Sequence, residues 1–89
     1  MKRIRLALHA AGSIAAREIP REELERTVEA PELVRPAGLG RHAYMRRYHD
    51  PILDADMLLR AIVEETESEL VVVTVYRTSQ IARYLRDQQ

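Results

Sequence analysis

Histidine, arginine and tyrosine side chains are the groups of this chain that could carry chemistry, because it contains no cysteine. The most unusual of them is Arg60, a charge inside the apolar run 56–64, where burying it unpaired would be costly. Arg60 either contacts an anionic substrate from the open side of a sheet or pairs with a carboxylate such as Glu18 or Glu64. His9 could act as a general base or acid because histidine titrates near neutral pH, or it could cap or pack a helix.

Tyr44, Arg46 and Tyr48 would share one face of a strand over 44–49, since side chains alternate along strands. Aromatic rings beside a cation are the arrangement with which proteins hold single-stranded RNA. The alternative is that these are ordinary, partly exposed strand residues. The opposite face would also carry polar side chains, so we expect this strand to be polar on both sides.

Metal chemistry is not expected. None of the three histidines lies four residues from another ligand, and no cysteine supports them: His9, His42 and His49. The sequence therefore predicts neither a metal site nor a cofactor.

A β-hairpin is the clearest element that could position these residues. Its strands are predicted over 56–64 and 69–77, joined by a short polar loop. Both faces of the second strand are largely apolar, which favours a central strand covered by helices on at least one side. With regular pairing Arg60 would lie opposite Val73, whereas one bulge in the loop would put it on the face of Tyr76.

Helices are predicted both before and after these strands along the sequence. Ile4 and Leu6 favour a short strand or extended entry, followed by an alanine-rich helix over 9–18. Arg17 in that helix could reach a phosphate or pair with the acidic segment that follows.

The second helix is expected to have Pro20 at its first position and to end at Pro31. An extended piece around 33–34 and a turn should follow, and Asp50-Pro51 should end the strand over 44–49. At the other end of the chain, Thr78 or Ser79 could cap a short terminal helix with Ile81 and Leu85 pointing inward.

This order of elements, with helices and antiparallel strands segregated, predicts one α+β domain over residues 1–89. The chain has 14 basic and 14 acidic residues, so no global field draws it to nucleic acid. Residues 1–17 and 35–48 each carry basic side chains and no acidic ones. They are ordinary solvated charges, or they meet in space and form a face for a polyanion.

Membrane association is not expected, since no apolar run approaches the roughly 20 residues of a spanning helix and no signal peptide follows the basic start. The lack of cysteine fits a reducing compartment. The sequence therefore predicts a cytoplasmic protein.

Several motifs, taken in order, resemble a known family. They are His9-Ala10, Arg17-Glu18-Ile19, an acidic helix ending in Glu29-Ala30-Pro31, a tyrosine-containing strand, Leu59-Arg60-Ala61-Ile62-Val63 and Val72-Val73-Thr74-Val75-Tyr76. Together they resemble a family of small bacterial domains of unknown function that is grouped with the RelE-like and BrnT-like toxins. The chain departs from the family pattern at Ser13, where the first of two arginines should fall, and in its neutral net charge.

The resemblance implies a RelE-like fold, in which helices pack on one face of a twisted antiparallel sheet of about three to five strands. It also implies a metal-independent endoribonuclease of the mRNA interferase type, whose partners would be an antitoxin protein and messenger RNA or the ribosome. On this hypothesis the catalytic residues would be His9, Arg17, Arg60 and Tyr76, and the RNA-binding residues Tyr44, Arg46, Tyr48, Arg77 and Arg83. If the first four form a site, they should lie within one phosphate's reach of each other.

Two other functions stay open. Ser13 and the neutral charge favour a non-catalytic module that uses the same sheet to bind a protein or ligand. The third alternative is a small-molecule-binding domain or a homodimer that pairs through an exposed strand edge.

Overall fold

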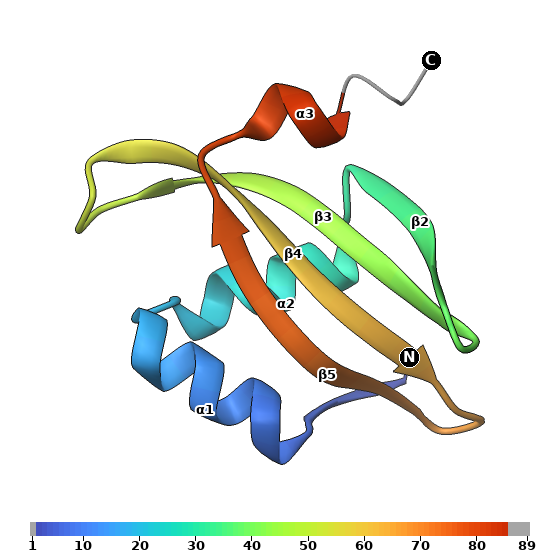
Figure 1. Ribbon diagram of the computed structural model, residues 1–89. Coiled ribbons are helices and arrows are strands. Elements are labelled where there is room, and N and C mark those ends of the chain that lie inside the picture. Colours follow the sequence, from blue (N-terminus) through green and yellow to red (C-terminus); the bar gives the residue numbers. More distant parts are fainter. Residues whose placement is uncertain (1, 86–89) are drawn as a thin grey trace.

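Helices pack on both faces of a five-stranded mixed sheet (Figure 1). The structure is a computed structural model that describes residues 2–85. The elements in chain order are β1 (Arg3–Leu6), α1 (Leu8–Arg17), α2 (Arg21–Glu29), β2 (Leu33–Gly38), β3 (Arg41–Asp50), β4 (Ala55–Glu65), β5 (Glu69–Thr78) and α3 (Ile81–Leu85). The predicted α+β class and the main hairpin, β4 with β5, are confirmed.

The strand order is β1-β5-β4-β3-β2, and one pairing differs from expectation. The pairs among β2, β3, β4 and β5 are antiparallel, but β1 runs parallel to β5, with Ile4 beside Leu70 and Leu6 beside Val72. The expectation of an all-antiparallel sheet was therefore wrong at β1. The alternation of Ile4 and Leu6 indicates which face of the strand is buried. It does not indicate whether the strand pairs in a parallel or an antiparallel direction, because the alternation is the same in both.

The helices α1 and α2 cover one face of the sheet, which we call the helix face. Ala10 from α1 and Leu24 and Val28 from α2 are buried there against the strands. The first helix ends where Glu18 adopts a left-handed conformation and its N–H bonds to the carbonyl of Ile14. Pro20 lies just before α2 rather than at its first position. No helix in residues 2–85 is long and apolar enough to cross a membrane.

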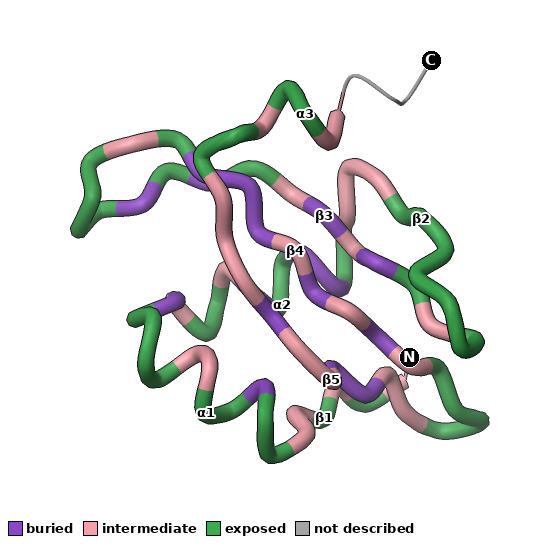
Figure 2. The backbone as a smooth tube through the Cα atoms, in the orientation of Figure 1, coloured by how far each residue is buried: buried purple, intermediate pink, exposed green. Residues whose placement is uncertain are grey.

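Short α3 packs on the opposite face, which we call the α3 face. Here a smaller cluster of Ala43, Met45 and Leu58 is buried, with Ile81 and Leu85 of α3 against it, as predicted. Buried positions therefore run along β4 on both faces, and it is the central strand of the sheet (Figure 2).

A bulge at Val73 determines which residues of β5 point to which face. Ile62 pairs with Thr74 but Val63 pairs with Val72, so Val73 has no partner in β4. As a result Val72 and Val75 both point to the helix face, whereas in a regular strand residues three apart would point to opposite faces.

The strand predicted to be polar on both sides is longer and more buried than expected. β3 buries Ala43 and Met45 on the α3 face and Tyr48 on the helix face. It ends at Asp50, as predicted, and the turn 51–54 leads into β4. The expectation failed because Met45 is apolar and most of the Tyr48 ring is apolar, so Met45 can be buried on the α3 face and Tyr48 on the helix face.

Candidate functional site

A cluster of cations and aromatic rings on the α3 face is the most distinctive polar feature of the sheet. The guanidinium carbon of Arg60 lies 4.4 Å from the ring centre of Tyr84 and 5.2 Å from that of Tyr76. Arg83 lies 5.8 Å from the same Tyr84 ring. We call Arg60, Tyr84 and Arg83 the arginine–tyrosine stack.

The bulge and the last helix together build this stack. Because Val73 is skipped, Tyr76 pairs directly with Arg60, so of the two predicted registers the bulged one is confirmed, with the bulge inside β5 rather than in the loop. The hydroxyl of Thr78 then accepts the N–H of Gln80, one residue before α3 begins. α3 lays Tyr84 over the sheet.

Arg60 has no carboxylate within ion-pair distance among residues 2–85. Its Nε donates to the sulfur of Met45 at 3.3 Å, and its other contacts are the two tyrosine rings. No side-chain polar atom of the described residues is buried without a partner. Arg83 donates to the side-chain oxygen of Gln80 and likewise has no carboxylate partner within the described residues. Arg60 and Arg83 are therefore two neighbouring cations with no carboxylate partner among residues 2–85.

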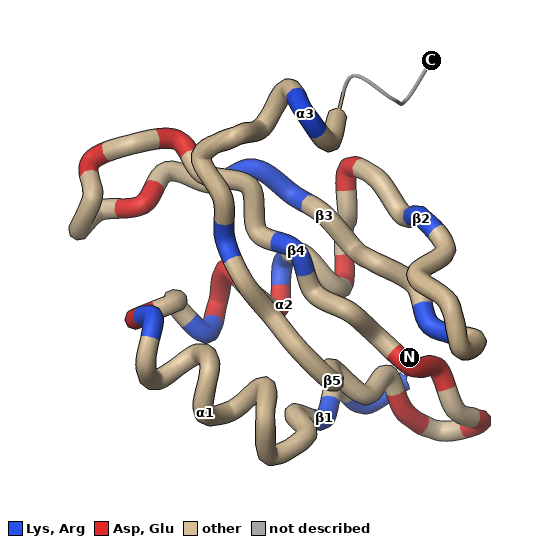
Figure 3. The backbone as a smooth tube through the Cα atoms, in the orientation of Figure 1, with Lys and Arg blue, Asp and Glu red and all other residues tan. Residues whose placement is uncertain are grey.

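Several other cations form ion pairs with acidic side chains, and Figure 3 shows where the two kinds of residue lie along the backbone. The ion pairs are Lys2–Glu65, Arg5–Glu69, Arg21–Glu25, Arg26–Glu23, Arg41–Glu64, Arg47–Glu32 and Arg77–Asp50. Paired charges give little net field, so an anion should bind where the unpaired cations stand.

The four candidate catalytic residues are not brought together. Arg60 and Tyr76 are neighbours on the α3 face, whereas His9 and Arg17 belong to α1 on the helix face. His9 is exposed, and Arg17 donates to the backbone carbonyl of Val75 at 3.4 Å. The sheet therefore separates the two pairs.

Most of the predicted RNA-binding residues lie on the helix face. Tyr48 is only 8 % exposed, so its ring is in the core and cannot stack on a base in this structure. Tyr44 packs against the same core, and Arg46 donates to the carbonyl of Ala30 at 2.9 Å. Arg77 is also on this face, where it donates to the carbonyl of Arg17. Of that predicted group only Arg83 lies on the α3 face.

A buried carboxylate, Asp50, organises the end of β3. Its Oδ1 accepts the N–H groups of Ile52 and Leu53, and its Oδ2 accepts the hydroxyl of Tyr48 at 3.0 Å and the guanidinium of Arg77 at 3.2 Å. The Leu53 N–H, more than any other group, lowers the pKa of Asp50. Burial, reinforced by Asp50, raises the pKa of Tyr48 to about 12. We interpret this network as structural.

Sequence reasoning used Asp50 only as a strand end. An aspartate directly before Pro51 is a turn signal, because its side chain can accept backbone N–H groups two or three residues on. That signal could have identified Asp50 as the group that holds the turn, but its buried partners from distant strands could not be read from the sequence.

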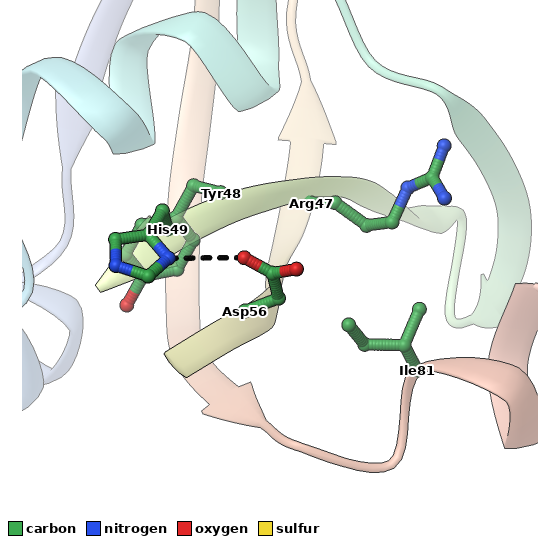
Figure 4. A pocket seen from close by; sticks show the side chains of 5 residues that line it. All are labelled: Arg47, Tyr48, His49, Asp56 and Ile81. Carbon is green, nitrogen blue, oxygen red and sulfur yellow. Dashed lines mark hydrogen bonds and ion pairs between the residues drawn. The ribbon is translucent and has the colours of Figure 1, made fainter. Parts of the chain in front are cut away.

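A pocket of about 360 Å³ lies between the β3–β4 hairpin and the start of α3 (Figure 4). It is lined by Arg47, Tyr48, His49, Asp56 and Ile81. His49 lies 3.0 Å from Asp56 through Nδ1 and 3.1 Å from Asp54 through Nε2. The hydrogen bond to Asp56, followed by that to Asp54, raises the pKa of His49. No group of three or more metal-ligand side chains forms a metal site in the part of the chain described.

No protein-family model, curated protein or solved structure matches this chain.

Proposed function

We propose that this protein is a binding module that holds single-stranded RNA on the α3 face, with Arg60 as its anchor. The observation that carries the proposal is the guanidinium of Arg60, packed against two tyrosine rings and left without a carboxylate among the described residues. A half-desolvated cation of this kind gains most from an anion. Arg83, which also contacts the ring of Tyr84, adds a second positive charge at the same place.

RNA suits this cluster better than an isolated anion does. A phosphate could bridge Arg60 and Arg83, while the neighbouring bases contact the edges and free surface of Tyr76 and Tyr84. Cationic and aromatic side chains in combination are what sequence-tolerant readers of single strands use. The stack contributes two cations, Arg60 and Arg83, so we expect a short site.

Binding of a labelled single-stranded RNA oligonucleotide of mixed sequence, measured by fluorescence anisotropy, tests the proposal. We expect Arg60→Gln and Arg83→Gln to weaken binding roughly ten- to hundredfold each, because each removes a charge-assisted hydrogen bond worth about 1.5–3 kcal/mol. Arg26→Gln is the matched control, since it removes the same charge from an exposed, paired arginine of α2. An affinity that all three variants lower equally, or no binding by the wild type, would overturn the proposal.

A second candidate is the toxin-like endoribonuclease that the resemblance implies. It is favoured by the contact between Arg60 and Tyr76, two of the predicted catalytic residues. The histidine of the α3 face is His49, which pairs with Asp56 of β4. Asp56 is four residues from Arg60 along the strand, which is about 13 Å. That separation places no histidine of the face beside Arg60, which is why binding without cleavage is our first proposal.

Cleavage can be tested directly. The same RNA incubated with protein is analysed on a denaturing gel, and bacterial growth is followed on induction of the wild type, Arg60→Ala and His9→Ala at matched soluble expression. RNA fragments together with growth arrest that Arg60→Ala relieves would establish the endoribonuclease. Intact RNA and normal growth, alongside measurable binding, would support the binding module. The antitoxin partner stays a prediction of the toxin hypothesis.

A further inference from the structure

The pocket beside α3 has its own chemistry, separate from the arginine–tyrosine stack. Its walls come from the end of β3, the start of β4 and the first residue of α3. At about 30 Å³ for each water-sized group, its 360 Å³ would hold roughly a dozen such groups. That is the size of a small metabolite rather than of a macromolecular segment.

A carboxylate with a free oxygen stands on one side of this pocket. One oxygen of Asp56 meets His49, and the other has no partner among the described residues. Figure 4 shows that second oxygen turned away from His49, toward the side where Arg47 lies. An ammonium group is the donor that would satisfy it, since it brings both charge and several N–H bonds.

A guanidinium stands on the other side. Arg47 donates through Nε and Nη2 to Glu32, which leaves Nη1 without an acceptor in residues 2–85. Asp56 is close enough to Arg47 to help raise the pKa of that guanidinium, after the larger effect of Glu32. Nη1 of Arg47 can therefore donate a hydrogen bond to an additional carboxylate oxygen.

The third wall is apolar. Ile81, the first residue of α3, faces the space between Arg47 and Asp56 in Figure 4. A simple anion would be repelled by Asp56 and the nearby Asp54, and a simple cation by Arg47. A ligand with both charges and an apolar group has a partner for each wall.

We propose that this pocket binds a free α-amino acid with an aliphatic side chain. Its ammonium group would contact Asp56, its carboxylate Arg47 and its side chain Ile81. The inference does not depend on RNA binding, because the residues of the stack do not line the pocket.

Titration with L-leucine, followed by the backbone amide resonances of the pocket residues in two-dimensional NMR, tests the proposal. We expect saturable shifts at millimolar concentration. N-acetyl-leucine lacks the ammonium group and leucinamide lacks the carboxylate, so each should bind roughly tenfold more weakly, as should Asp56→Asn and Arg47→Gln.

Two controls make the result decisive. Asp54→Asn removes the other carboxylate beside His49 without removing a pocket wall, and Arg60→Gln removes the RNA anchor, so both should keep leucine binding. Absence of saturable shifts with L-leucine, L-valine and L-isoleucine would overturn the proposal. So would equal shifts with N-acetyl-leucine, because binding would then not use Asp56.

Discussion

At the scale of single residues, Arg60 is an unusual choice for a central strand. Contacts of a guanidinium with aromatic rings contribute about 0.5–2 kcal/mol each, which offsets part of the cost of removing the charge from water. They do not replace a carboxylate, so the residue is tolerated by the fold rather than required by it. An apolar side chain of similar length would fill the same space beside Met45 without that cost.

Replacing Arg60 with methionine should therefore keep or raise stability while removing RNA binding. We expect the free energy of unfolding to be unchanged or to rise by about 1 kcal/mol, because a functional cation is exchanged for a packed apolar side chain. Urea denaturation followed by circular dichroism measures this, with Arg26→Met on exposed α2 as control. A loss of more than about 1 kcal/mol would instead mean that Arg60 is a structural residue.

His49 gives a prediction about pH. Asp56 and Asp54 raise its pKa above the ordinary value of 6.5, so the folded state holds the proton more tightly than the unfolded chain does. The stability that these pairs contribute is fully present below pH 6.5 and is lost as the pH rises through the folded pKa.

An NMR titration of the imidazole should place the midpoint of His49 above those of free histidine and of His49 in Asp56→Asn. Since the His49 side chain is 57 % exposed, we expect the associated change in stability to be small and to shrink with added salt. A midpoint that Asp56→Asn does not lower would contradict the geometry of this pair.

At the scale of elements, the sequence predicted the helices and the main hairpin to within a few residues. Pro20 and Pro31 lie on either side of α2 and mark its ends. The apolar runs of β4 and β5 predict two strands. The bulge could not be predicted, because residues 70–73 are all apolar and no break in alternation marks Val73. The candidate site was therefore predicted less well than the elements. The face on which Tyr76 lies depends on one skipped residue, and the distance of His9 from Arg60 depends on which face of the sheet α1 covers.

Deleting Val73 should be tolerated, which is unusual for a residue inside an interior strand. Without it Val72 and Thr74 become neighbours opposite Val63 and Ile62, so the existing pairs form a regular ladder. Deleting Ala61 instead would shift the rest of β4 by one residue and send its core side chains to the wrong face. Thermal unfolding should be cooperative for the Val73 deletion and abolished for the Ala61 deletion; the reverse order would refute the register.

At the scale of the whole molecule, neutral net charge and nucleic-acid binding are compatible because the charges are unevenly paired. Acidic side chains at the end of β4 form ion pairs with Lys2 and Arg41, and Asp54 in the turn between β3 and β4 and Asp56 at the start of β4 contact His49 (Figure 3). Arg60 and Arg83 of the α3 face, which have no carboxylate partner in the described part of the chain, lie between these two acidic ends. The molecule should therefore attract RNA over a short distance and from one side.

The salt dependence of RNA binding follows from this arrangement. If a single strand is held by Arg60 and Arg83, two phosphates lose their counterions, and the slope of log K against log salt should be roughly −1.4. Arg83→Gln should reduce that slope to roughly −0.7, whereas Arg26→Gln should leave it unchanged. Anisotropy titrations at several potassium chloride concentrations measure the slopes. A wild-type slope steeper than about −3 would mean that cations outside the stack also bind phosphate, and a slope near zero would mean that stacking on Tyr76 and Tyr84, rather than charge, holds the RNA.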